Sequence, residues 1–191
     1  MPEYVPVLKV LQSSERHAPR MRYRCPACSE IHQGFPALAY QLPDPIYALT
    51  ADERDARAII SSDLCILDDR RHFVRCVLSV DVNGYDEQLE FGPWVEIDRN
   101  AFSRYSVWFN LAASPGWSQV KGKLANAFPA QEQTTLGLSC CLILPDTDDE
   151  RPTVKIMDPK HPLFDDQAAG ISIARATELV SSLKGYMLIL D

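Results

Sequence analysis

The sequence lacks the features that mark a membrane protein, a secreted protein or a familiar enzyme. No stretch approaches the roughly 20 apolar residues that a membrane helix needs. Residues 1–10 contain Glu3 and Pro6 and have no apolar run behind a basic start, so we expect no secretory signal. The patterns GxGxxG, HExxH and GxSxG are absent, which leaves dinucleotide-binding, zinc-hydrolase and serine-hydrolase assignments without support.

An excess of positive charge is also missing. Lys and Arg number 19 against 26 Asp and Glu, which gives a net charge of −7. Such a surface repels phosphate backbones, so nucleic-acid binding is the least favoured function. Six cysteines without an export signal indicate a reducing cytoplasm, where thiols stay free or bind metal.

The chain is long enough for one domain with a real core, since 46% of its 191 residues are hydrophobic. We expect a leader over residues 1–21 and a single α+β domain over residues 22–191. Residues 72–82 alternate apolar and polar side chains with the period of a strand, and residues 89–97 should pair back antiparallel. The strands outnumber the helices, so the fold class predicted is α+β, a mainly antiparallel sheet with a few covering helices.

Three helices are predicted from capping residues and apolar spacing. Thr50 and Glu53 form a capping box, and the helix that follows should end near Ser61. Asp98 is suited to cap a short helix over residues 99–111. Residues 172–184 keep apolar side chains at helical spacing.

The most informative motif is a Cys/His knuckle within residues 22–36. Cys25 and Cys28 stand two residues apart, His32 follows, and Gly34 and Pro36 are turn residues. Two thiolates at this spacing can hold one tetrahedral cation, and a nearby imidazole nitrogen is a third donor. The candidate cofactor is therefore a structural zinc ion, whose role would concern folding more than chemistry.

A closed structural zinc site needs four donors, and the knuckle supplies three. The candidates for the fourth are Cys65, Cys76, His72, His161 and His17, among which the sequence alone does not choose.

Two other interpretations of the knuckle remain open. Cys25 and Cys28 can be free thiols in a tight turn, or a redox pair of the glutaredoxin-like Cys-Pro-x-Cys type. The redox pattern needs a buried strand before the motif and a helix after it. Residues 21–24 are too charged for such a strand, and the glycine and prolines after Cys28 prevent a long helix.

His161 stands close to Asp165 and Asp166, an arrangement that could transfer protons or bind metal. We favour a structural interpretation, in which the acids neutralise a helix start and His161 anchors a turn.

Taken together, the ordered motifs resemble the bacterial family catalogued as domain of unknown function 2199. The matching motifs are Cys25-x2-Cys28-x3-His32 with Gly34 and Pro36, then Ser62-Asp63-Leu64-Cys65, Phe73-Val74-Arg75, Phe91-Gly92-Pro93-Trp94-Val95, and His161-Pro162-Leu163 with Gln167 and Gly170. Family members usually carry Gly directly after the second Cys, whereas this chain has Ser29. The resemblance implies a bacterial, cytoplasmic, single-domain protein and no particular activity. It favours Cys65 and His161 as additional metal donors, because both lie within shared motifs.

The sequence therefore predicts a non-enzymatic binding domain with a structural zinc knuckle and a protein partner. The candidate metal ligands are Cys25, Cys28, His32, Cys65 and His161. The alternative is a thiol or metal-dependent enzyme that uses Cys25 and Cys28. A nucleic-acid partner is unlikely, and no membrane association is expected.

Overall fold

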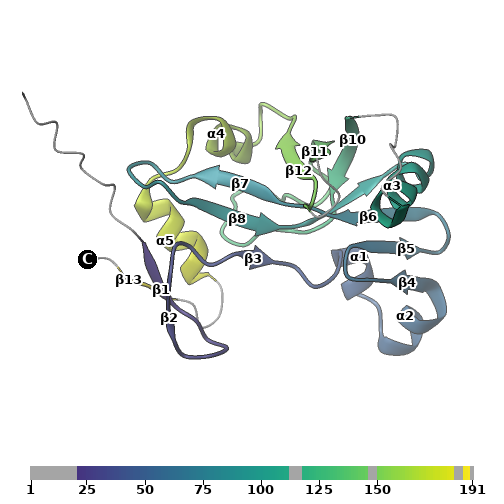
Figure 1. Cartoon of the computed structure of the whole chain (residues 1–191), viewed down its shortest axis with the longest axis horizontal. Helices are drawn as coiled ribbons and strands as arrows, with labels where there is room; N and C mark the ends of the chain where they lie inside the picture. The colour runs from purple at the N-terminus through teal and green to yellow at the C-terminus, as the bar shows by residue number, and fades with distance from the viewer. Residues whose placement is uncertain (1–20, 112–117, 146–149, 183–186, 190–191) are drawn as a thin grey trace, which may run out of the picture.

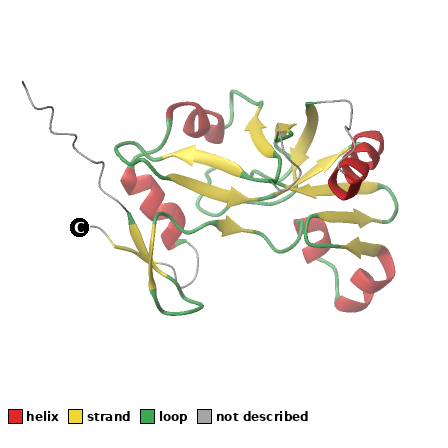
Figure 2. Cartoon of the chain, in the orientation of Figure 1, coloured by secondary structure: helices red, strands yellow, loops and turns green. Residues whose placement is uncertain are grey.

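The computed structural model describes residues 21–111, 118–145, 150–182 and 187–189 (Figure 1). Within these ranges the chain forms five helices and thirteen strands, and every strand pair except β3 with β8 is antiparallel (Figure 2). The strands are β1 Arg22–Arg24, β2 Ile31–Gln33, β3 Leu38–Ala39, β4 Ala58–Ile60, β5 Leu64–Leu67, β6 Arg71–Arg75, β7 Leu78–Asp81, β8 Gln88–Gly92, β9 Trp94–Ile97, β10 Gln119–Leu124, β11 Ser139–Ile143, β12 Thr153–Ile156 and β13 Met187–Ile189. The helices are α1 Asp44–Tyr47, α2 Ala51–Arg57, α3 Arg99–Leu111, α4 Pro162–Ala169 and α5 Ile173–Ser181. The α+β class with a mainly antiparallel sheet is confirmed.

The strands form three sheets. The largest has seven strands in the order β12-β11-β10-β9-β6-β5-β4, and two three-stranded sheets have the orders β3-β8-β7 and β13-β1-β2. The three-stranded sheet β13-β1-β2, here called the small sheet, lies at one end of the molecule, and the β4-β5 edge of the largest sheet lies at the other (Figure 1). The Cys/His knuckle belongs to this small sheet.

The strand predicted over residues 72–82 is interrupted, which corrects the sequence interpretation. It divides into β6, which pairs with β9 in the large sheet, and β7, which pairs with β8 in a separate sheet. At the break, Val77 bonds to the β12 region, since its N–H donates to Pro152 O and its carbonyl accepts from Val154 N. Pro93, which lies between β8 and β9, accepts from Cys76 N but has no N–H to donate in return, so one ladder hydrogen bond is missing where the sheet changes.

Two of the predicted helix starts are confirmed, and one helix end is wrong. The Thr50–Glu53 capping box forms as expected, and Asp98 Oδ1 accepts the backbone N–H of Ala101 at the start of α3. However, α2 ends at Arg57 and not near Ser61, because residues 58–60 leave the helix to pair with β5 as strand β4. Pairing with a neighbouring strand therefore overrides the helical spacing of the apolar residues there.

The residues near His161 form a helix of their own that the sequence analysis did not predict. Helix α4 begins after His161 and ends at Ala169, where Gly170 with a φ of 74° breaks the helix. Helix α5 begins after Ser172, whose side chain accepts from Arg175 N, and its described part ends at Ser181. This agrees with the predicted helix over residues 172–184 as far as the structure describes it, since residues 183–184 lie outside the described ranges.

One large core joins the small sheet to the rest of the protein. Met21, which the sequence analysis assigned to the leader, is 2% exposed and belongs to this core together with Leu188 of β13. Residues 1–20 lie outside the described ranges, so the leader itself stays a prediction. A second, smaller core cluster contains Ile46, Cys65, Leu67, Phe73, Trp94 and Ala125. No helix in the described part of the chain is long and apolar enough to cross a membrane.

Candidate metal centre

The knuckle is a short β-hairpin closed by backbone hydrogen bonds at both ends. Gly34 N donates to Met21 O at 2.7 Å, and Cys25 N donates to Glu30 O at 2.9 Å. Between them, Ser29 N donates to Cys25 O at 2.8 Å, which folds residues 25–29 into a tight turn. Ser29 adopts a φ of 63°, the left-handed conformation that a glycine adopts without strain. Ser29, which stands where the resembling family usually has glycine, is therefore the residue that the turn holds in the left-handed conformation.

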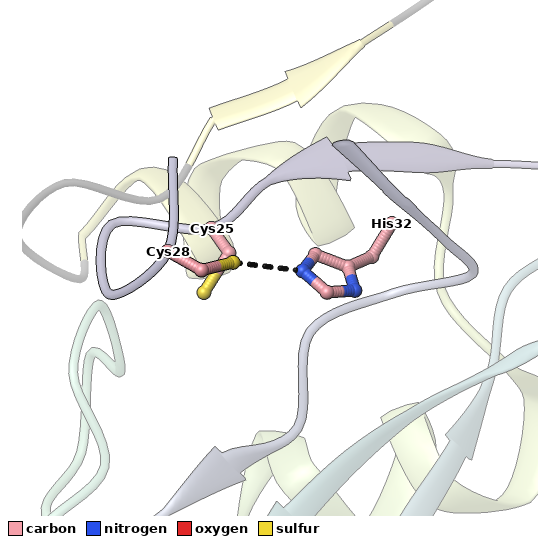
Figure 3. A group of neighbouring side chains, drawn as sticks. All are labelled: Cys25, Cys28 and His32. Carbon is pink, nitrogen blue, oxygen red and sulfur yellow. Dashed lines mark hydrogen bonds between the residues drawn. The ribbon is translucent and has the colours of Figure 1, made fainter. Parts of the chain in front are cut away.

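The hairpin brings three of the predicted metal ligands together. The Sγ atoms of Cys25 and Cys28 and a ring nitrogen of His32 all lie within 4.8 Å of one another. Cys28 Sγ is 3.1 Å from His32 Nε2, and Figure 3 shows the imidazole directed at the paired sulfurs. Cys28 is exposed, and Cys25 and His32 are half-buried. This group could hold a metal ion.

Backbone amides of the turn favour the thiolate form of Cys25. The N–H groups of Cys28 and then Ala27 bond to its sulfur and lower the pKa of the Cys25 thiol, with a further contribution from the Cys28 side chain. Burial and the nearby carboxylate of Glu30 oppose this effect without cancelling it. A sulfur that accepts amide hydrogen bonds is suited to the charged form, which is the form that binds a metal.

The orientation of His32 is set by Tyr23 on the adjacent strand. The two residues are directly opposite in the β1–β2 register, and their rings stack with centroids 5.4 Å apart and planes 22° apart. Stacking holds the imidazole edge-on to the sulfurs, with Nε2 toward Cys28. Sequence analysis missed Tyr23, although its position two residues before Cys25 places both on the same face of a strand.

Cys65 is not part of this group. It lies on β5, opposite Phe73, fully buried in the second core cluster at the other end of the molecule from the hairpin (Figure 1). Burial raises the pKa of its thiol to about 12, which disfavours the thiolate that a metal requires. Cys76 is likewise fully buried, and its Sγ donates to Val74 O.

His161 is not part of the group either, because both of its ring nitrogens have other partners. Nδ1 accepts the backbone N–H of Leu163 at 3.1 Å and so caps α4, and Nε2 lies 3.3 Å from Gln133 O. Because Nδ1 accepts a hydrogen bond, the ring proton of a neutral imidazole is on Nε2. The Nε2–H group then donates to the Gln133 carbonyl. His72 packs against Phe102 beneath α3, and His17 lies outside the described residues.

Comparisons with known proteins give one match. A family model described as an uncharacterized protein conserved in bacteria (DUF2199) matches residues 24–171, a range that includes Cys25, Cys28 and His32. Neither the curated proteins nor the solved structures gave a match.

Proposed function

The chain belongs to the bacterial family DUF2199, and we propose that it is a non-catalytic binding domain whose hairpin holds a structural zinc ion. The observation that supports this is the convergence of two thiols and one imidazole within 4.8 Å on residues 25–32. Two soft thiolates and a borderline imidazole are a donor set that suits zinc better than harder cations such as magnesium or calcium.

The proposed ligands are Cys25, Cys28 and His32. Zinc in structural sites takes four donors in a tetrahedron, so the fourth position falls to water or to a donor outside this group. We do not include Cys65 or His161, because the first is buried in a distant core and the second is engaged at both nitrogens.

A structural role fits the size of the element that carries the ligands. Strands β1, β2 and β13 have three residues each, and strands this short gain little stability from pairing alone. An ion bound to both arms of the hairpin fixes the β1–β2 register and thereby the pairing of β1 with β13. In such sites the free energy of metal binding becomes free energy of folding.

The alternative, a thiol or metal-dependent enzyme, has one observation in its favour. Cys28 Sγ lies 3.1 Å from His32 Nε2, and an imidazole at that distance can accept a thiol proton. Against the glutaredoxin-like redox role, the residues after Cys28 form strand β2 and not a helix whose N-terminus would stabilise a thiolate. We therefore favour the structural role.

The cellular setting that we propose is the reducing cytoplasm, with a protein as the binding partner. All six cysteines are free, as expected of thiols that are kept reduced. Cys140 and Cys141 are neighbours in β11 and are also free thiols, with no disulfide between them.

The experiment that tests the proposal is a metal measurement on purified protein. We expect one zinc ion per chain by elemental analysis, and its loss in Cys25→Ser, Cys28→Ser and His32→Ala. Cys141→Ser is the matched control, because this half-buried thiol on β11 should keep full zinc content. Co²⁺ loading should give thiolate-to-cobalt absorption in the wild type and not in Cys25→Ser.

Metal-free protein after growth and refolding with excess zinc would contradict the structural site. So would equal zinc loss in Cys141→Ser and Cys25→Ser. Turnover of a disulfide substrate that disappears in Cys25→Ser while the fold is retained would instead support the enzyme.

A further inference from the structure

Strands β10, β11 and β12 present one exposed face that is basic, although the chain as a whole is acidic. Their antiparallel register places Lys121 opposite Cys141 and Cys141 opposite Lys155, with Lys123 opposite Ser139. Side chains alternate along a strand, so these residues share one face, and all three lysines are exposed. The three adjacent strands carry no acidic residue.

Two acidic residues beside this face, Glu96 and Asp98, accept hydrogen bonds from other parts of the chain. Glu96 stands opposite Lys123 in the β9–β10 register, but both of its oxygens accept from Arg71, at 2.9 and 2.6 Å. Asp98 Oδ1 accepts from Ala101 N at the start of α3. In the described ranges none of the three lysines forms an ion pair, so their charge is available to a partner.

The face is hollowed where β9, β10 and β11 meet. A cavity of about 730 Å³ is lined by Arg70, Lys121 and Lys123, by the carboxylates Glu96 and Asp98, and by Ser139 and Met157. Gly122 lies in its wall, and a Cβ at this position would come within 2.5 Å of Val95 Cγ1 and 2.8 Å of Glu96 O. The cavity therefore has three cationic side chains against two carboxylates, and Glu96 and Asp98 already accept hydrogen bonds from Arg71 and Ala101. The balance of charge around the cavity is positive, and the space is large enough for a carboxylate side chain.

We propose that this face binds an acidic polypeptide segment in an extended conformation. Lys121 and Lys123 are two residues apart on one strand, about 7 Å, which is the spacing of alternate side chains in an extended peptide. Carboxylates at alternate positions of such a peptide match these two lysines. Two partly exposed apolar side chains could add contact with the peptide. Ile143, 37% exposed, is the last residue of β11, and Met157, 50% exposed, directly follows β12.

A nucleic acid fits this face less well than an acidic peptide. Sheet surfaces that bind single strands use aromatic side chains as stacking platforms, and the exposed residues of these strands include none. A net charge of −7 also repels a long polyanion more strongly than a short peptide. The inference names the class of protein partner and so rests on the proposed binding function, but it does not depend on the metal.

The test is binding of a labelled 12-residue peptide of alternating Glu and Val, followed by fluorescence anisotropy. A peptide with Gln in place of Glu and a 12-nucleotide single-stranded DNA serve as comparison probes. We expect the Glu peptide to bind and its affinity to fall as salt rises from about 50 to 300 mM. Lys121→Gln/Lys123→Gln should weaken binding at least about tenfold, and Lys155→Gln by a smaller factor.

Lys160→Gln is the matched control, because this exposed lysine precedes α4, lies on none of the three strands and does not line the cavity, and it should change affinity less than about twofold. Equal binding of the Gln peptide, equal loss in Lys160→Gln, or tighter binding of DNA through Lys121 and Lys123 would overturn the inference. Thermal melting of each variant separates lost binding from lost folding. Zinc-loaded protein that fails to bind the Glu peptide rejects this inference alone, and peptide binding by zinc-free Cys25→Ser protein supports it independently of the metal site.

Discussion

Tyr23 and His32 face each other across β1 and β2, and their rings stack with centroids 5.4 Å apart. Tyr23 contributes no donor atom to the metal group, so its effect on zinc binding is through the orientation of the imidazole. We expect Tyr23→Ala to lower zinc affinity about tenfold, as is typical when a residue that orients a ligand is removed. Competition with a chromogenic chelator measures this.

Tyr23→Phe is the control, because it keeps the ring and removes only the hydroxyl. Its zinc affinity should stay within about threefold of the wild type, well inside the effect expected for removal of the ring. A Tyr23→Ala protein with unchanged zinc affinity would show that the stack does not orient His32.

Ser29 holds a left-handed backbone conformation in the knuckle turn, with a φ of 63°. A side chain in this region costs about 1–2 kcal/mol relative to glycine, offset in part by the greater freedom of glycine in the unfolded chain. Ser29→Gly should therefore raise the free energy of unfolding by about 0.5–1 kcal/mol. Chemical denaturation measures the change.

Ser29→Ala is the matched variant, since alanine has the same backbone restriction as serine, and it should leave stability close to that of the wild type. The Arg24 hydrogen bond to the Ser29 carbonyl persists in both variants. A destabilised Ser29→Gly protein would contradict the role assigned to this backbone conformation.

Asp63 and Arg151 form an ion pair across 88 residues of sequence, with Arg151 Nε 2.6 Å from Asp63 Oδ1. Burial raises the pKa of Asp63, but the hydrogen bond from Ser62 and the pairing with Arg151 outweigh it, so the pKa lies below its usual value. A lowered pKa contributes stability above the unfolded-state value, about 3.9, and this contribution is lost as pH falls through the folded-state value.

Arg151→Gln should therefore cost about 1 kcal/mol at pH 7, a modest figure because the arginine is 44% exposed and screened by solvent. The difference from the wild type should begin to shrink below about pH 4 and continue to shrink as pH falls through the lowered pKa of Asp63, because protonation of the carboxyl removes its attraction to Arg151. Urea denaturation at pH 7 and pH 3 measures it. A difference that is equal at the two pH values, or as large in Lys160→Gln, would contradict the assignment.

Asn126 is fully buried and joins three segments of the chain through its side chain. Its Oδ1 accepts from Trp94 N at 2.8 Å, and its Nδ2 donates to Leu42 O at 2.9 Å and to Asp44 Oδ1 at 2.8 Å. Asn126→Asp has nearly the same shape but replaces the donor with an oxygen that faces two acceptors. We expect a loss of about 3 kcal/mol or more in unfolding free energy.

Asn100→Asp introduces the same change at an exposed position in the first turn of α3, where a negative charge is favourable. This control should be neutral or slightly stabilising in the same denaturation assay. An Asn126→Asp protein as stable as the wild type would show that the three hydrogen bonds are dispensable.

The part of the site that could be predicted from sequence is the part whose geometry is local. Cys25, Cys28 and His32 lie within eight residues, and one hairpin is enough to bring them together. The helix that begins after Asp98 was predictable for the same reason, since its cap and its apolar spacing lie within the segment itself.

The sequence could not predict features that depend on contacts between segments far apart in the chain. Cys65 and His161 have the right chemistry for zinc, but β5 turns the first into the core and α4 uses the second as its cap. The alternating pattern of residues 72–82 predicts one continuous strand, because the pattern does not reveal which sheet each half joins. The structure divides it between two sheets. Residues 58–60 have apolar spacing that suits a helix, and pairing with β5 makes them a strand.

The amino-acid order alone thus determined the class of fold, the hairpin that gathers Cys25, Cys28 and His32, and the helices predicted from their own caps, because each depends on residues close together in the chain. The tertiary structure decided the register that aligns Lys121 with Lys155, the exclusion of Cys65 and His161 from the metal group, and the division of one strand between two sheets. These depend on hydrogen bonds and packing between segments tens of residues apart, and many pairings of the same strands satisfy the same local pattern.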